Sequence, residues 1–517
     1  MQQRIDQILA RMTPEEKVGQ MILASIEVSR MDAATQEFLR GNHIGNVILF
    51  GKNCAGRAAL AQLNADIQHT VMDSTGLPAL IAIDQEGGCV TRLRSEATVF
   101  PSAMVLARTG EPANAYKTGQ IMGTELRALG INLDCAPVLD TLTGPPERRY
   151  YGQDSQTAAD YGCAMARGLQ DAGVLACGKH FPGHEQAGAD THFGFVVDPS
   201  PRDVLLEQCL LPFRRSIAEG LASVMVSHVC FPALDNSGTP ASLSGPIIQG
   251  VLRDQLNFDG LVISDGLQMH AIVDSCGAPQ GCVQAAIAGC DLLITGNGGD
   301  NADPTGRDVQ TPCIRAMLNA VADGTLPMAR VDEAVRRILA CKLALGNVLP
   351  APDAAVQDWT SHVQFADELA ASAIAVQDPD HLLPLPDGTL FIARRSGTGT
   401  GVTEGDRITE SFSPLAARLL HGTSAVYQKT DELLSLSAAC SSAPCVVFAF
   451  GTREEGAAAA PFVAQLAAVS KHLCVVCLAE LDALRQYPFA SASVSAWDRT
   501  LPAMRAVCRA LQAGLQS

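Results

Sequence analysis

The most regular feature of the chain is an alternation of short apolar runs with longer amphipathic stretches. The runs are continuous in Val, Ile and Leu, without polar alternation, which is typical of parallel strands buried on both faces of a sheet. Eight candidate strands of this kind occupy residues 18–24, 47–50, 80–83, 131–139, 174–177, 224–226, 261–263 and 292–295. The segments between them, such as 55–72, 113–129, 157–172 and 202–219, have the length and apolar period of helices.

Eight successive strand–helix units predict a (β/α)8 TIM-type barrel over residues 1–347. A doubly wound open sheet is the structural alternative, but no glycine-rich dinucleotide or P-loop signature follows an early strand. Residues 348–362 have the composition of a linker, and we expect a smaller α/β domain, an αβα sandwich, over residues 363–517. Its predicted strands are 390–393, 445–450 and 474–478, and its predicted helices are 366–376, 414–420, 461–470 and 502–511.

Polar side chains follow five of the predicted barrel strands. A single aspartate in such a position is usually a helix cap or a turn former. In a barrel, however, the carboxyl ends of all strands meet on one rim, where barrel enzymes place their chemistry. Five titratable strand ends therefore favour a shared site over coincident caps. The residues at these ends are Asp84, Asp140, Lys179 with His180, His228 and Asp265.

The loop after the fifth strand concentrates side chains that can transfer protons or bind a ligand. Its sequence is GKHFPGHEQAGADTHF (178–193). It holds His180, His184 and His192, although the whole chain has only 11 histidines. Asp190 stands two residues before His192, so its carboxylate could orient one imidazole nitrogen while the other handles protons. An imidazole titrates near pH 6.5 and needs little tuning to act first as an acid and then as a base.

Two classes of reaction fit these residue types. In the first, Asp265 attacks a carbon centre and His192 protonates the leaving group, as in a retaining glycosidase. In the second, His180, His184, His228 and Asp265 bind a metal that activates water. The metal alternative would prefer a histidine pair at the end of the first strand, which instead ends in MILAS. A third class, a sugar-binding module without catalysis, would need no combination of nucleophile and Asp–His pair.

Composition limits the partners that the protein is expected to bind and the cellular compartment in which it is expected to work. The net charge of -17 argues against nucleic acid, because binding to phosphates needs a basic face. No apolar run reaches the ~18 residues of a membrane span, and residues 1–11 do not resemble a signal peptide. The 17 cysteines lack the tandem spacing of zinc sites and fit a reducing compartment. We therefore expect a cytoplasmic enzyme without a membrane partner.

Seven motifs of the barrel, in their order along the chain, resemble those of glycoside hydrolase family 3. The similarity points to the β-N-acetylglucosaminidase branch of that family, because this branch carries the Asp-x-His pair on the barrel loop. The motifs are IDQEGGCVTRLR (83–94), CAPVLD (135–140), RYYGQD (149–154), GKHFPGH…DTH (178–192), MVSHVCFPALD (225–235), PASLS (240–244) and GLVISDGLQM (260–269). The C-terminal part resembles the α/β sandwich of the family more weakly.

The resemblance implies retaining hydrolysis of β-linked sugars without a metal or other cofactor. It assigns Asp265 as the nucleophile and His192, held by Asp190, as the acid/base. The residues that it implies for sugar binding are Asp84, Arg92, Arg149, Lys179 and His180. Three positions depart from the usual pattern of the family: Cys89 replaces an arginine, Glu185 replaces a glycine and Gly266 replaces a second aspartate.

The expected function is release of terminal β-linked N-acetylglucosamine from a small carbohydrate or a muropeptide derived from peptidoglycan. A β-N-acetylglucosaminide phosphorylase of the same family is the nearest alternative, because a histidine repels phosphate less than a carboxylate does. The aglycone, the oligomeric state and the role of the second domain stay open at this point.

Overall fold

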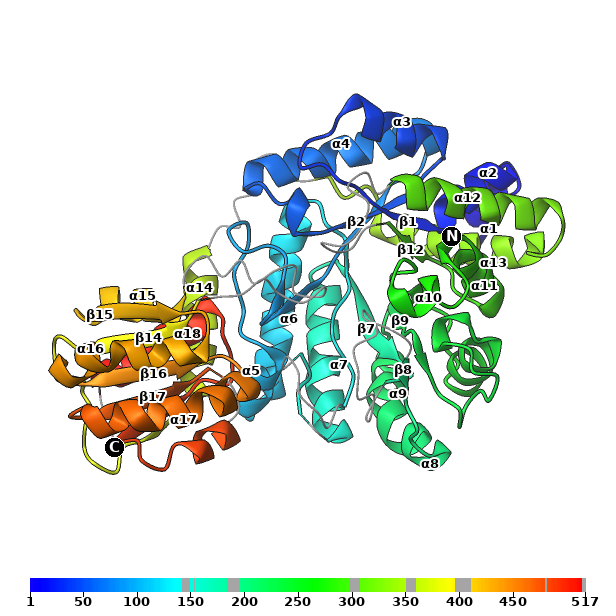
Figure 1. Cartoon of the computed structure of the whole chain (residues 1–517). Coiled ribbons are helices and arrows are strands. Elements are labelled where there is room, and N and C mark those ends of the chain that lie inside the picture. Colours follow the sequence, from blue (N-terminus) through cyan, green and yellow to red (C-terminus); the bar gives the residue numbers. More distant parts are fainter. Residues whose placement is uncertain are drawn as a thin grey trace.

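The chain folds into two parts, a barrel and a smaller sheet domain (Figure 1). The structure is a computed structural model that describes residues 1–141, 149–152, 154–183, 196–296, 307–349, 359–395, 411–478 and 481–513. Within these ranges no helix is long and apolar enough to cross a bilayer.

The barrel is built from eight parallel strands in the order β11-β9-β7-β6-β3-β2-β1-β12. A parallel bridge between Ile263 and Leu292 links the two ends of this order, so the sheet closes on itself. The predicted (β/α)8 barrel is therefore confirmed. The strands are β1 (Ile22–Ser25), β2 (Asn46–Leu49), β3 (Leu80–Ile83), β6 (Leu133–Asp134), β7 (Leu175–Phe181), β9 (Ser223–Val226), β11 (Leu261–Ser264) and β12 (Leu293–Thr295).

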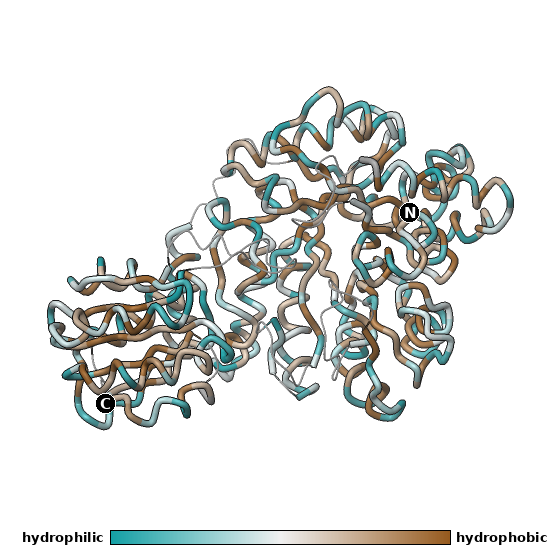
Figure 2. The backbone as a smooth tube through the Cα atoms, viewed as in Figure 1, coloured by the Kyte–Doolittle hydropathy of each residue, from teal (hydrophilic) through white to brown (hydrophobic). Residues whose placement is uncertain are grey.

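Helices surround the barrel, and the apolar strands form its core (Figure 2). The longer ones are α4 (Arg57–Thr75), α6 (Pro112–Ala128), α7 (Ser155–Asp171), α11 (Ala278–Ala288), α12 (Arg307–Ala322) and α13 (Met328–Leu345). The predicted helix 202–219 consists of α8 (Arg202–Val204) and α9 (Leu210–Ala218), joined by a π-helical segment, Leu205–Cys209.

The prediction of a strand over residues 18–24 is wrong in its first half. Residues up to Met21 belong to α2 (Pro14–Met21), and only Ile22 begins the strand β1. A capping box starts this helix: Thr13 Oγ1 accepts from the N–H of Glu16 at 3.3 Å, and a Glu16 carboxylate oxygen accepts from the N–H of Thr13 at 2.8 Å. The apolar run thus joins the buried face of a helix to a buried strand.

The second domain is a six-stranded sheet with helices on both faces, which confirms the predicted sandwich. Helices α15 (Phe412–Leu419) and α18 (Leu501–Ala513) pack on one face, and α17 (Arg453–Val469) packs on the other. The strands are β13 (Ala375–Gln377), β14 (Leu390–Arg394), β15 (Thr423–Tyr427), β16 (Val446–Phe450), β17 (Leu473–Cys477) and β18 (Ala492–Ser495). The predicted helix 366–376 is wrong at its end, because Val376 lies in β13.

Helix α14 (Trp359–Ser372) lies between the two parts (Figure 1). Its Phe365 packs edge-on against Phe100 of the barrel, with ring centroids 6.4 Å apart. Beyond this helix, the Asp498 carboxylate accepts a hydrogen bond from the backbone N–H of Ser102 at 2.8 Å. The limits 1–347, 348–362 and 363–517 stay a prediction.

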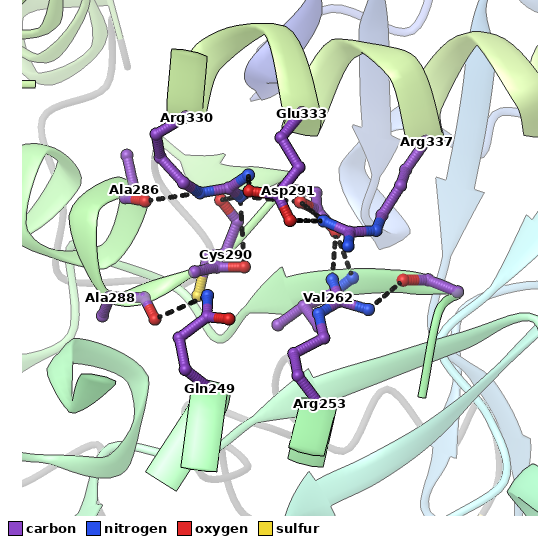
Figure 3. A network of polar contacts seen from close by, with 12 residues as sticks. Gln249, Arg253, Val262, Ala286, Ala288, Cys290, Asp291, Arg330, Glu333 and Arg337 are labelled. Carbon is purple, nitrogen blue, oxygen red and sulfur yellow. Dashed lines mark hydrogen bonds and ion pairs between the residues drawn. The ribbon is translucent and has the colours of Figure 1, made fainter. Parts of the chain in front are cut away.

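A buried ionic network fastens α13 to the amino-terminal side of the barrel strands (Figure 3). Asp291, which is fully buried just before β12, accepts hydrogen bonds from Arg253 and Arg330, each at 2.7 Å. A third guanidinium, that of Arg337, lies 3.4 Å from the same carboxylate. The backbone N–H of Val262 in β11 also donates to Asp291, at 3.0 Å. One carboxylate thus joins α13, β11 and the segment before β12.

Lys342, near the end of α13, is buried, and within the described part of the chain its ammonium has only neutral hydrogen-bond acceptors. Its Nζ donates to Gln20 Oε1 at 2.7 Å and to the carbonyl oxygen of Gly45 at 2.8 Å, and both acceptors are neutral. Burial lowers the pKa of this ammonium to about 7. In the unfolded chain the side chain returns to an ordinary lysine pKa near 10.4.

We therefore expect the free energy of unfolding to rise between about pH 7.5 and 9.5, by at most ~1.4 kcal/mol per pH unit from this group. In that window the unfolded state binds a proton that the folded state has released, so raising the pH favours folding. Denaturant titrations at several pH values measure the slope. Lys342→Met should flatten it, whereas Lys471→Met, at an exposed position, should leave it unchanged. An identical slope in wild type and Lys342→Met contradicts this explanation.

Candidate active site

A pocket of about 590 Å³ opens at the carboxyl ends of the barrel strands. Six residues predicted from the sequence line it together, although they lie far apart in the chain, from position 84 to position 265. These six residues are Asp84, Arg92, Arg149, Lys179, His180 and Asp265.

One side of the pocket is a compact network of charges. Lys179, buried in β7, places its Nζ 2.8 Å from Asp84 Oδ1 and 2.7 Å from Glu86 Oε1. Arg149 holds Glu86 through two hydrogen bonds of 2.8 and 2.7 Å. Arg92 reaches the other oxygen of Asp84 at 3.2 Å. The network gives a polar ligand several fixed donors and acceptors in one place.

Mutual pairing keeps these groups charged. Burial opposes the charge on Asp84, but the adjacent Lys179 and Arg92 outweigh it and hold the pKa of this carboxyl well below its usual value. In Glu86 burial is likewise outweighed by Arg149 and Lys179, and the pKa is lowered. The two carboxylates in turn raise the pKa of Lys179 against the effect of burial. Neither carboxylate is therefore suited to donate a proton near neutral pH.

The turn after β3 presents Asp84 and Glu86 to the pocket. Chain segments β4 (Gln85–Gly87) and β5 (Val90–Thr91) form a short antiparallel pair there. Between the two carboxylates, the backbone N–H of Gln85 donates to buried Asp134 at 2.9 Å. At Gly87, with φ of 86°, a Cβ would lie 2.8 Å from the carbonyl oxygen of Pro101, so this close approach requires glycine.

Sequence reasoning did not single out Glu86. It stands two residues after Asp84 in the motif IDQEGG, and alternate residues of an extended segment face the same side. That spacing was the available signal. Cys89 lies in the same turn and is half-buried, and Arg92 still lines the pocket despite this departure from the family pattern.

His180 is oriented by a second buried carboxylate. Its Nδ1 lies 2.7 Å from Asp140 Oδ2, and its backbone N–H donates to Asp140 Oδ1 at 3.1 Å. Asp140 ends the preceding strand segment and is buried, so it fixes both the main chain and the ring of His180. The imidazole thereby keeps one orientation along the pocket wall.

Asp265 follows β11 and is partly exposed to the pocket. The backbone N–H of Gly266 donates to its Oδ1 at 2.7 Å. The carbonyl oxygen of Gly266 lies 2.9 Å from Nε2 of His228, and Nδ1 of the same ring lies 2.7 Å from Ser242 Oγ. His228 is fully buried and supports the turn that carries Asp265, so the structure does not place it as a metal ligand.

Asp190 and His192 lie outside the described residues, as do His184 and Glu185. The description ends at Gly183 and resumes with β8 (Val196–Val197). The acid/base role of the Asp–His pair therefore stays a prediction. Across the part of the chain that the structure describes, no three His, Cys, Asp or Glu side chains gather as a metal site would require.

Comparison with known proteins decides the family. Residues 13–341, which span the barrel, match the glycosyl hydrolase family 3 N-terminal domain. The chain belongs to glycosyl hydrolase family 3. This confirms the family expected from the sequence motifs and the assignment of the chain as a glycosidase.

Similar proteins cover the barrel or the whole chain. A protein of Nitrosospira multiformis named β-hexosaminidase is 34% identical over 291 residues, 54% of this chain and 82% of the relative. The structure of a family 3 β-N-acetylglucosaminidase from Paenibacillus sp. FPU-7 has a TM-score of 0.88 and 31% identity, and covers 97% of this chain and 96% of that one. The β-glucoside phosphorylase BglX has a TM-score of 0.78 at 20% identity, which shows a shared fold.

Proposed function

We propose that the protein is a retaining β-N-acetylhexosaminidase that releases terminal β-linked N-acetylglucosamine. The observation that carries this proposal is the pocket in which Asp265 lies with Asp84, Lys179 and Arg149. A carboxylate nucleophile and a set of paired charges for sugar hydroxyls are the parts that such an enzyme needs on one rim. The names of the Nitrosospira and Paenibacillus relatives support the choice of an N-acetylated sugar.

In the first step, Asp265 attacks the anomeric carbon of the bound sugar. The new bond from carbon to carboxylate oxygen forms as the glycosidic bond breaks, and His192 gives its proton to the departing oxygen. In the second step, His192 takes a proton from water, and the resulting hydroxide displaces Asp265 from the same carbon. Two inversions give net retention, and Asp190 stabilises the protonated imidazole that exists before the first step and again after the second.

The charged network serves to hold the sugar. Asp84 presents a carboxylate that can accept hydrogen bonds from sugar hydroxyls, and Arg92, Arg149 and Lys179 present donors. Because each charge is already paired inside the protein, the neutral sugar does not have to compensate a buried charge. Binding energy from these hydroxyls is then available to place the anomeric carbon against Asp265.

A panel of aryl glycosides, assayed with and without added phosphate, tests the proposal. We expect 4-nitrophenyl N-acetyl-β-glucosaminide to be the preferred substrate, and free N-acetylglucosamine to be the product in both conditions. A β-N-acetylglucosaminide phosphorylase would give sugar 1-phosphate only when phosphate is present. Preference for a β-glucoside, or formation of the sugar phosphate, contradicts the proposal.

The proposed acid/base role of His192 can be tested by measuring how the activity of a His192 variant depends on the leaving group of the substrate. We expect His192→Ala to lose roughly 10²–10⁴-fold in kcat/KM with a poor leaving group, and less with 4-nitrophenolate, which departs without a proton. An equal loss on both substrates would indicate that His192 only binds the sugar.

We further propose peptidoglycan fragments as the natural substrate and the cytoplasm as the compartment. The 17 cysteines are free thiols in the structure, which supports a reducing environment. Incubation with purified muropeptides that carry a terminal N-acetylglucosamine should release that sugar. Failure to release it from muropeptides, with normal turnover of the aryl glycoside, would direct the search to another glycan.

A further inference from the structure

The pocket has a second side whose chemistry differs from that of the charged network. Met225 of β9, Ile294 of β12 and Met269 after β11 line it together with one polar side chain, Gln268. Strands β9 and β11 pair directly, and β12 closes the barrel beside β11, so these residues come from one arc of the rim. A carboxamide among apolar side chains can hydrogen-bond to an amide of a ligand, while the apolar side chains contact an attached methyl group.

The carboxamide of Gln268 lies over Gly266, the residue that follows Asp265. A Cβ on Gly266 would lie 2.7 Å from Gln268 Nε2 and 3.2 Å from Oε1. Any side chain at position 266 would therefore push the carboxamide away. This gives a physical reason for the glycine found where the family pattern has an aspartate. Position 266 and the amide of Gln268 form one arrangement next to the nucleophile.

The amide of Gln268 is also incompletely satisfied. Its Oε1 is buried and forms no hydrogen bond to any described atom of the chain. A buried polar atom without a partner costs free energy, which a ligand recovers if it supplies the missing partner. The terminal torsion of a glutamine is broad and roughly two-fold, so a half-turn about it can exchange the oxygen and the nitrogen that face a ligand.

We propose that Gln268 determines specificity for the sugar's 2-acetamido group, a role that rests on the proposed function. The acetamido group is the substituent next to the anomeric carbon that Asp265 attacks, and it combines an amide with a methyl group. The amide can hydrogen-bond to the Gln268 carboxamide, while the methyl contacts Met225, Met269 or Ile294. The sugar's hydroxyl groups then face the charged side of the pocket. Gly266 is the positioning residue that leaves room for this amide.

The test compares two substrates that differ only at C2, the 4-nitrophenyl β-glycosides of N-acetylglucosamine and of glucose. For Gln268→Met, which keeps the length of the side chain, we expect kcat/KM to fall by ~10-fold or more on the N-acetylglucosaminide. On the glucoside we expect a change of less than about 3-fold, because no acetamido contact is lost. The ratio of the two values therefore falls, which a general loss of structure would not produce.

Gly266→Ala provides a second variant that leaves Gln268 in place. The backbone of Gly266 is outside the left-handed region, so alanine can adopt it, and the added methyl displaces the carboxamide. We expect the same direction of change in the substrate ratio. The double variant should have a ratio no lower than that of Gln268→Met alone, because both changes remove one interaction.

The outcomes separate this inference from the proposed function. Wild-type protein that prefers the glucoside overturns the proposed function, whatever the variants do. Wild-type protein that prefers the N-acetylglucosaminide, with an unchanged ratio or an equal loss on both substrates in Gln268→Met, overturns the role of Gln268 alone.

Discussion

Replacing Asp265 by alanine should reduce turnover of 4-nitrophenyl N-acetyl-β-glucosaminide by on the order of 10⁴-fold or more. The loss is expected to be this large because the variant has no atom that can form the covalent intermediate. The hydrogen bond from the N–H of Gly266, which now holds Oδ1 at 2.7 Å, would have no carboxylate to orient. Steady-state rates at saturating substrate, corrected for traces of wild-type enzyme, measure the effect.

Asp274→Ala is a matched control for this substitution. Asp274 lies a short distance further along the chain, and its side chain is 68% exposed beside His270. The turnover rate of Asp274→Ala should stay within about 2-fold of that of the wild type, because most surface substitutions have small effects. Near-normal turnover in Asp265→Ala, with the protein folded, would remove Asp265 from the mechanism.

Replacing Asp291 by alanine should lower the free energy of unfolding by roughly 3–5 kcal/mol. The carboxylate is fully buried, and Arg253, Arg330 and Arg337 converge on it (Figure 3). Without it, Arg253 would be a buried guanidinium with no anion opposite. Helix α13 would also lose the carboxylate through which it is joined to the backbone N–H of Val262 in β11. Urea titrations followed by circular dichroism measure the difference.

Asp259→Ala is the control for the network. Asp259 pairs with the same Arg337 at 3.3 Å, but its side chain is 95% exposed, so solvent screens the pair. We expect a change in unfolding free energy within about 0.5 kcal/mol. If Asp259→Ala and Asp291→Ala destabilise the protein equally, burial of the carboxylate is not the reason for the strength of the network.

Most strands of the barrel could be predicted from sequence because they contain continuous apolar runs that are buried in the sheet. The prediction for residues 131–139 was too long, because only Leu133–Asp134 form a strand there, β6. The apolar run at 18–24 was wrongly predicted to be a strand throughout, because it joins the buried end of α2 to β1. Periodicity does not distinguish a short buried helix from a strand. In the second domain, β15 was missed because most of its residues are at least partly exposed at the sheet edge. The short β18, with the sequence ASVS, lacks the large apolar residues of a typical strand.

The members of the pocket could be predicted to a greater extent than its internal contacts. Strand ends identified Asp84, Lys179 and Asp265, because the topology of a barrel brings such ends together. Pairings such as Asp140 with His180 depend on side-chain directions that a sequence does not encode locally. Gln268 carried no signal at all, because its role comes from the absence of a side chain at Gly266.

Covalent trapping of the enzyme tests the central claim most directly. A 5-fluoro-N-acetyl-β-glucosaminyl fluoride should form the glycosyl-enzyme faster than water can release it, so the intermediate accumulates. Peptide mass spectrometry of the inactivated protein is then expected to find one fluorinated sugar, attached to Asp265. A sugar on another carboxylate, such as Asp84 or Glu86, with Asp265 unmodified would contradict the assignment of the nucleophile.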